Sequence, residues 1–354
     1  MTGSRPQYIH EIDALRGIAA LSVACVFHLF LMFGAKFTGP LDGLPVLSWL
    51  YNAGWTMVDL FFVVSGYVFA HVYLAENALK TGVTGKSFFV ARFARLYPLH
   101  ILTMFLVIPP IALGVVTQGL HDNLDLYHFV LNLLMLQGSG LNDRYSFNVV
   151  SWSVSVEVLC YVLFFVAARA GAGALFLTAM FAIFVGVWLT LEDNMLTSNL
   201  GRGLSGFFAG YFAWRLRNLN IPSSVLVPCI IIPILWVPNF INFGTFLGLT
   251  AFPAAVLLAQ RLPFLGARFF RWLGDRSYSI YLWHPVVYFS AKAYIPNFHG
   301  FREDHPFLLA GGAIFVVLAL SDLGYRYFET PMRGLIRGKL NGQAKPRKEA
   351  LNPV

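Results

Sequence analysis

Charged residues are scarce in this sequence. They account for 12% of its 354 residues, whereas an ordinary soluble domain contains about 25%. Apolar residues account for 57%, and the mean hydropathy is +0.65. This composition excludes a soluble globular protein and predicts an integral membrane protein.

Cysteine is also rare. Cys25, Cys160 and Cys229 all fall in apolar stretches, and they have neither the spacing of a metal site nor an obvious disulfide pairing. We expect them to be small apolar packing residues and expect no metal. The sequence lacks a fixed repeat, a linker, a large charge block and a cleavable signal peptide. It therefore predicts one membrane domain over residues 1–337 and a disordered cytoplasmic tail over residues 338–354.

Long apolar runs occupy most of the sequence. A helix needs roughly 20 residues to cross a bilayer core, and ten runs approach that length. We therefore predict an all-α, polytopic membrane helix bundle with about ten transmembrane helices. A shorter run, Leu126 to Leu136, predicts an interfacial or re-entrant helix. The ten predicted spans are residues 15–35, 55–78, 96–117, 149–168, 174–191, 199–214, 222–238, 243–260, 277–296 and 307–325.

Lysine and arginine are distributed unevenly between the predicted loops. With ten spans, 20 of the 25 basic residues fall on one side, which the positive-inside rule identifies as cytoplasmic. Both termini are then cytoplasmic. Since this asymmetry accounts for most of the +8 net charge, no nucleic-acid partner is expected.

The first apolar run contains two ionisable residues, Arg16 and His28. In a continuous helix they would lie about 18 Å apart along the axis, with His28 deep in the membrane and small residues such as Gly17 and Ala24 on its side. Ionisable groups inside a membrane are costly and by default suggest function. The alternative is an interhelical hydrogen bond without chemistry.

Two arginines, Arg92 and Arg95, lie at the cytoplasmic entrance to the third span. Residues three apart share a helix face, so both guanidinium groups could bind one phosphate-bearing anion. The alternative is simple anchoring of the helix at the cytoplasmic surface.

Carboxylates enter two other spans. Glu157 follows Ser153 by four residues, a spacing that permits a local hydrogen bond, and Asp59 precedes a Ser-Gly step at residues 65–66. The ninth span begins with a polar segment that contains Tyr278 and His284. Its tyrosines could equally belong to an interfacial aromatic belt.

Taken together, these segments resemble acyltransferase family 3, a family of membrane proteins. The resemblance extends over nearly the whole chain. It rests on the order and spacing of the following motifs: Asp13-Ala-Leu-Arg16-Gly17 with His28, Val58-Asp59-Leu-Phe-Phe-Val-Val-Ser65-Gly66, Arg92-Phe-Ala-Arg95-Leu-Tyr-Pro98, Ser151-Trp-Ser153-Val-Ser155-Val-Glu157, Ser277-Tyr-Ser-Ile-Tyr-Leu-Trp-His284-Pro285 and Tyr327-Phe-Glu329-Thr-Pro331-Met-Arg333.

The resemblance implies transfer of an acyl group, usually acetyl, from cytoplasmic acyl-coenzyme A to a hydroxyl of a glycan or lipid-linked saccharide. It implies a bacterial-type plasma membrane and lipid contact. In the family, the histidine matching His28 is regarded as catalytic and the arginines matching Arg92 and Arg95 as part of the donor site, where we also expect Arg16. Some relatives carry a fused hydrolase-like domain that completes the transfer. We expect no such domain in this chain and therefore expect single-step transfer. We expect Asp13, Asp59 and Glu157 as catalytic carboxylates and Ser153, Tyr278 and His284 as supporting residues.

Two mechanisms fit His28. The neutral ring, whose ordinary pKa is about 6.5, could remove the proton from the attacking hydroxyl. One of the three carboxylates could orient the ring. Alternatively, it could accept the acyl group itself.

A transporter or flippase remains an alternative function. An intramembrane hydrolase that pairs Ser65 with His284 is disfavoured, because Val63 stands where a nucleophile elbow has glycine. Acceptor, acyl length and oligomeric state stay open.

Overall fold

The computed structural model describes residues 8–29, 44–74, 83–114, 124–142, 144–192, 194–235 and 242–341. Every regular element in these ranges is helical, as the predicted all-α class requires. The elements are α1 (His10–Cys25), η1 (Phe27–Leu29), α3 (Pro45–Ala53), η4 (Gly54–Thr56), α4 (Met57–Leu74), α6 (Gly85–Leu106), α7 (Ile108–Ala112), α8 (Leu126–Leu133), η7 (Val149–Ser151), α9 (Trp152–Ala170), α10 (Ala172–Leu189), α11 (Met195–Leu216), α12 (Ser223–Leu235), α13 (Phe243–Leu249), α14 (Ala251–Ala259), η8 (Pro263–Gly266), α15 (Arg268–Asp275), α16 (Ser277–Tyr294), α17 (Phe298–Asp304), α18 (Pro306–Gly324), η9 (Tyr325–Glu329) and α19 (Thr330–Asn341).

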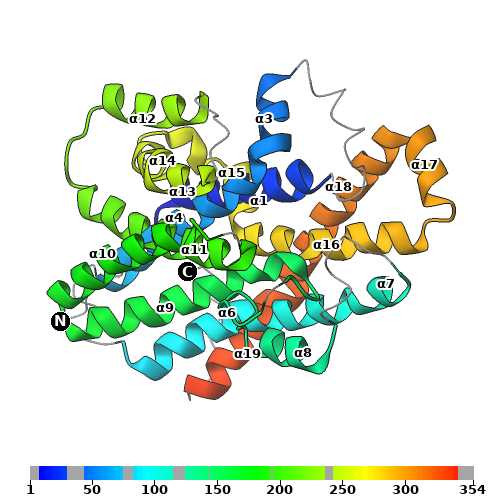
Figure 1. Ribbon diagram of the computed structural model, residues 1–354, viewed down its shortest axis with the longest axis horizontal. Coiled ribbons are helices and arrows are strands. Elements are labelled where there is room, and N and C mark those ends of the chain that lie inside the picture. The colour runs from blue at the N-terminus through cyan, green and yellow to red at the C-terminus, as the bar shows by residue number, and fades with distance from the viewer. Residues whose placement is uncertain are drawn as a thin grey trace.

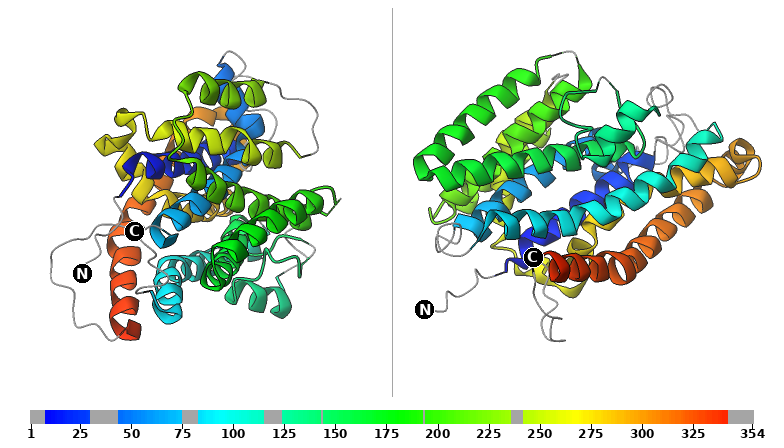
Figure 2. Two further views of the ribbon diagram at one scale, coloured as in Figure 1. Left: turned by 90° about the vertical axis from the view of Figure 1, so that its left-hand side faces the viewer. Right: turned by 90° about the horizontal axis from the view of Figure 1, so that it is seen from below.

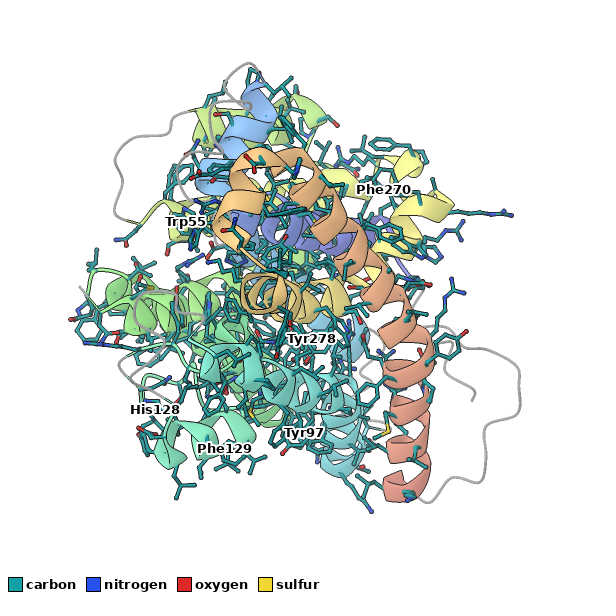
Figure 3. All side chains as sticks on the ribbon, turned by 90° about the vertical axis from the view of Figure 1, so that its right-hand side faces the viewer. Trp55, Tyr97, His128, Phe129, Phe270 and Tyr278 are labelled. Carbon is teal, nitrogen blue, oxygen red and sulfur yellow. The ribbon has the colours of Figure 1, made fainter. Side chains whose placement is uncertain are left out.

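Most of the long helices run along the long axis of the molecule (Figure 1). Helix α18 crosses them obliquely and continues into α19 through the π-helical turn η9. Figure 3 shows α18 and α19 as one column, with α6 beside its α19 end. The last helix of the described chain therefore returns to the side of an early one.

Six helical segments of the described chain are long and apolar enough to cross a membrane. The outer ones leave large apolar side chains uncovered, as on α10 (Phe181, Phe184) and α18 (Leu308, Phe315). Such faces suit contact with lipid chains. The short run predicted at Leu126 to Leu136 forms helix α8, which has 8 residues.

Helices α4 and α11 approach each other through glycines. A Cβ on Gly66 would lie 1.7 Å from the carbonyl oxygen of Phe207, and a Cβ on Gly210 would lie 1.9 Å from that of Val63. Only residues without a side chain permit this distance, and small residues are the usual means of close helix packing in membranes. The contact fixes α4, which carries Asp59 and Ser65, against α11.

The first span differs from the single long helix that we predicted. Helix α1 ends at Cys25, and His28 lies in the 3-10 turn η1. The hydroxyl of Tyr288 in α16 donates a hydrogen bond to the carbonyl oxygen of Ala24. A helix end leaves carbonyl groups unpaired, and this bond satisfies one of them from outside the helix. The distance along a continuous helix therefore does not describe His28.

Two further expectations need correction. Cys25 and Cys160 are buried, but Cys229 is exposed on α12, so it is not a packing residue inside the bundle. Helix α19 reaches Asn341, four residues into the segment 338–354 that we expected to be disordered. Residues 342–354 lie outside the described residues.

The glycine contact predicts the effect of one methyl group. Gly210→Ala should lower the free energy of unfolding by about 1–3 kcal/mol, because overpacking forces α4 and α11 apart. Thermal unfolding of the purified protein in detergent measures the change. Gly311→Ala is the matched control, since a Cβ at Gly311 in α18 meets no atom within 4 Å. If both variants unfold at the wild-type temperature, the two helices do not pack this closely.

Candidate active site

Two histidines from opposite ends of the chain form a pair inside the bundle. Nδ1 of His28 lies 2.7 Å from Nε2 of His284, and the ring centroids are 4.8 Å apart with an interplanar angle of 20°. His284 is fully buried, whereas His28 is partly exposed. We call these two residues the histidine pair.

Helix α16 fixes the buried half of this pair. Nδ1 of His284 lies 3.3 Å from the carbonyl oxygen of Ile280, one turn earlier. The rings of Tyr281 and Tyr288 meet the His284 ring edge to face, with centroids 5.8 and 5.7 Å away. The hydroxyl of Tyr281 donates to the carbonyl oxygen of Val150 at 3.1 Å, while Tyr288 holds the end of α1. Both tyrosines thus keep His284 facing His28.

Arginines gather at the other end of α1. The guanidinium of Arg92 lies over the rings of Phe69, Tyr73 and Tyr161, with distances of 5.1, 5.9 and 6.0 Å to their centroids. Its side chain is buried, and its Nε has no hydrogen-bond partner among the described residues. Cation-π contacts stabilise the charge but leave its N–H groups available for an anion.

Arg95 lies near further charges. Its charge interacts with those of Arg16 and Asp13. Arg16 itself lies 3.5 Å from Asp13, which also accepts a hydrogen bond from Tyr8. The structure therefore brings together the three arginines that the sequence assigned to a donor site, with Asp13 as a partial counter-ion.

Glu157 belongs to this same region. It accepts hydrogen bonds from Ser65 and from Tyr161, one helical turn further on, and its charge interacts with that of Arg16. The expected local bond to Ser153 is wrong, because the Ser153 hydroxyl instead donates to Tyr281 at 3.0 Å. Ser65, which we had considered as a partner of His284, is bonded to Glu157.

Asp59 lies elsewhere and has its own partner. It forms a two-point ion pair with Arg202 of α11, in which Nε and Nη2 lie 3.0 and 2.7 Å from the two carboxylate oxygens. Arg202 also lies over the rings of Trp55 and Trp152, at 4.5 and 5.6 Å from their centroids, and donates to Asn199 at 2.9 Å. The described contacts join Asp59 to Arg202 and give it no bond to the histidine pair.

The two tyrosines at the start of α16, Tyr278 and Tyr281, do not belong to an exposed interfacial belt. Tyr278 and Tyr281 are buried, and Tyr278 lies near the centre of the bundle in Figure 3. Its hydroxyl donates to the carbonyl oxygen of Leu96 in α6 at 2.6 Å. Tyr278 therefore connects the helix of His284 to the helix of the two arginines.

Comparison with known families gives this arrangement its context. The profile described as an acyltransferase domain, Acyl_transf_3, matches residues 9–326. The chain belongs to acyltransferase family 3. The resemblance stated from its motifs is thereby confirmed, and both the histidine pair and Arg16, Arg92 and Arg95 fall within the matched family region.

Individual family members are distant. The peptidoglycan O-acetyltransferase OatA of Listeria monocytogenes is 23% identical over 376 residues, covering 92% of this chain and 56% of that protein. The O-acetyltransferase OatA of Staphylococcus aureus is 23% identical, covering 93% of this chain and 58% of that protein. Protein 2 in the picA locus of Rhizobium radiobacter is 36% identical over 107 residues, or 30% of this chain. The chain thus spans little more than half of the OatA relatives, and no solved structure matches it.

Sequence analysis did not identify several residues that contribute to this candidate active site. The tyrosines of α16 are evident in the sequence, but the sequence analysis assigned no role to Tyr281 or Tyr288. Arg202 stood out as a charge within a predicted span, and an equally isolated Asp59 was the available signal for a pair. Among the described residues, no group of three His, Cys, Asp or Glu side chains is arranged to hold a metal ion.

The Asp59–Arg202 pair predicts a stability effect. Asp59→Ala should cost about 3–5 kcal/mol of unfolding free energy, because it leaves the Arg202 charge buried and unpaired. The double variant Asp59→Ala/Arg202→Ala should lose less than the sum of the two single variants. Unfolding midpoints of the four proteins measure this coupling. Additive losses would show that the two side chains do not stabilise each other, and normal stability with lost turnover in Asp59→Asn would instead assign Asp59 to catalysis.

Proposed function

We propose that this chain is a membrane O-acyltransferase that moves an acyl group, acetyl first, from cytoplasmic acyl-coenzyme A to a hydroxyl of a cell-envelope glycan. Membership of acyltransferase family 3 supports the reaction class. The names of the OatA relatives support acetyl as the group and peptidoglycan as the type of acceptor. The observation that carries the proposal is the 2.7 Å bond between a partly exposed and a buried histidine.

We further propose ten membrane crossings in a bacterial-type plasma membrane, with both termini cytoplasmic. The crossings are α1, α4, α6, α9, α10, α11, α12, α13 with α14, α16 and α18. Arg16 in the first half of α1 and Arg92 and Arg95 in the first half of α6 then share the cytoplasmic side. The positive-inside rule supports this orientation, which puts the arginines where a cytoplasmic donor arrives.

The donor site in this proposal consists of Arg16, Arg92 and Arg95. Coenzyme A carries several phosphate groups, and arginine suits them because its planar fork can form two parallel hydrogen bonds. The nine residue steps from Arg16 to Cys25 correspond to about 14 Å of helix axis. The flexible arm of the donor would extend along α1 and bring the thioester to His28.

The histidine pair specifies which nitrogen of His28 can act as a base. If Nδ1–H of His284 donates to the Ile280 carbonyl, its Nε2 carries a lone pair and accepts a hydrogen bond from Nδ1–H of His28. In neutral His28 the proton-free nitrogen is then Nε2. His284 would thus hold the tautomer of His28, the task that a carboxylate performs in a catalytic triad.

The reaction follows from this tautomer. Nε2 of His28 takes the proton of the acceptor hydroxyl while that oxygen attacks the thioester carbonyl. A new ester bond forms, the carbon–sulfur bond breaks, and the leaving sulfur receives the proton from His28. The alternative, in which His28 first accepts the acyl group, requires a covalent intermediate that labelled donor without acceptor would trap.

Purified protein in liposomes tests the function. Wild-type protein should consume acetyl-coenzyme A and transfer label to added envelope glycan, whereas His28→Ala should lose both activities because no base remains. Mass analysis of surface glycans from cells with each variant should show one acyl mass fewer in the His28→Ala cells. A pure transporter would leave acetyl-coenzyme A intact, and that result would reject the proposal.

His284 should act as a positioning residue. His284→Leu should lower kcat by about 100-fold, because misplacing a catalytic group by 1 Å can cost that much, with KM for the donor unchanged. His284→Gln should recover part of the loss, since its amide oxygen can accept from Nδ1–H of His28. Steady-state kinetics measure both. Equal kcat in the Leu and Gln variants would show that His284 only fills space.

A further inference from the structure

Two further arginines face the donor site from a helix that the family profile does not include. The match ends at residue 326, and α19 begins at Thr330. Figures 2 and 3 both show α19 beside α6. Arg333 and Arg337 are four residues apart on α19 and therefore share one helix face. The sequence motifs included Arg333 without a role in donor binding, and Arg337 counted only as a cytoplasmic charge.

The four arginines of these two helices form two levels. The charge of Arg333 interacts with that of Arg95, and the charge of Arg337 interacts first with Arg92 and then with Arg95. We call Arg95 with Arg333 the inner level and Arg92 with Arg337 the outer level. Each level has one arginine from α6 and one from α19.

The inner level lies nearer to the histidine pair. Leu96, next to Arg95, is bonded to Tyr278 in the first turn of α16. His284 lies six residues further along the same helix, or about 9 Å. Arg92 lies nearly one turn of α6 before Arg95, in the opposite direction. A ligand that reaches from the outer level to His28 must therefore pass the inner level.

The arginines lack enough counter-ions. Their Nε atoms are buried without a hydrogen-bond partner in the described chain at Arg16, Arg92, Arg333 and Arg337. Arg333 lies 3.9 Å from Glu329, and no ion pair involves Arg337 in the described chain. Buried donors without partners are costly, and like charges repel. Both costs disappear when an anion with several phosphate groups binds.

We propose that α19 is the second half of the donor site, in which Arg95 and Arg333 bind the diphosphate of coenzyme A and Arg92 and Arg337 bind its 3′-phosphate. This inference rests on the proposed function, because the order of groups follows from a thioester at His28. From that end, coenzyme A presents the thioester, the flexible arm, the diphosphate and then the 3′-phosphate. A phosphate monoester carries about −1.5 to −2 charge, which suits an outer level of two guanidinium groups.

The test uses coenzyme A and 3′-dephospho-coenzyme A as probes, with binding to the full chain in detergent measured by titration calorimetry. Wild-type protein should bind coenzyme A about 10-fold more tightly than the dephospho form, as a charge-assisted contact allows. Arg337→Gln should weaken coenzyme A binding about 10-fold and leave the dephospho form unchanged. Lys339→Gln is the control, because Lys339 is exposed on the same helix and should change neither affinity.

Each result decides between the two proposals. Equal weakening of both probes by Arg337→Gln, or no weakening at all, would reject the role of α19. Binding without any acyl transfer would reject the proposed function and leave the phosphate site standing, whereas failure to bind either probe would reject both. The same phosphate chemistry occurs in lipid headgroups. If phosphatidic acid raises the unfolding temperature through Arg337 while the two probes bind alike, the outer level serves the membrane and the proposal is wrong.

Discussion

Every polar side chain inside this bundle must find its partner within the protein, because the surrounding hydrocarbon offers none. The constraint explains why buried groups occur as pairs between distant helices. Asp59 pairs with Arg202, Glu157 accepts from Ser65, and the hydroxyl of Tyr288 satisfies the end of α1. Several buried groups of the described chain depart from this rule, among them the indole N–H groups of Trp214 and Trp283 and the Nε atoms of four arginines. The arginines differ from the indoles in carrying charge, which is why the proposed anionic ligand is assigned to them.

Helices α1 and α16 together connect the two halves of the site. Helix α1 carries Arg16 in its first half and leads to His28 just beyond its end. Helix α16 begins with Tyr278, which is bonded to α6 beside Arg95, and continues to His284. In the proposed function, the same two helices determine both the position of the donor phosphates and the position of the base. Since Tyr288 joins these helices to each other, the distance between the two positions is fixed by packing rather than by a loop.

The all-helical class was predictable from the sequence, because lipid demands long apolar runs. Each of the ten predicted runs contains a helix, but only six helical segments of the described chain are long and apolar enough to cross a membrane. The end of α1 at Cys25 was not predictable, since it depends on a hydroxyl from α16. Spacing correctly grouped Arg92 with Arg95, because neighbours on one helix are a local property. It could not join His28 to His284, which are 256 residues apart. Three carboxylates were the candidates for the partner of His28, but the imidazole of His284 is the group bonded to it.

The unequal balance of charge around α19 has an evolutionary consequence. An arginine that pairs with a carboxylate is retained because the fold needs it, with or without a substrate. Arg337 has no such pair in the described chain, and its nearest cations repel it. If α19 is part of the donor site as proposed, mutation of Arg337 would relieve repulsion in the empty protein, and only use of a polyanionic substrate would keep the residue in place. A descendant that abandoned this substrate would lose the α19 arginines long before it lost Arg202.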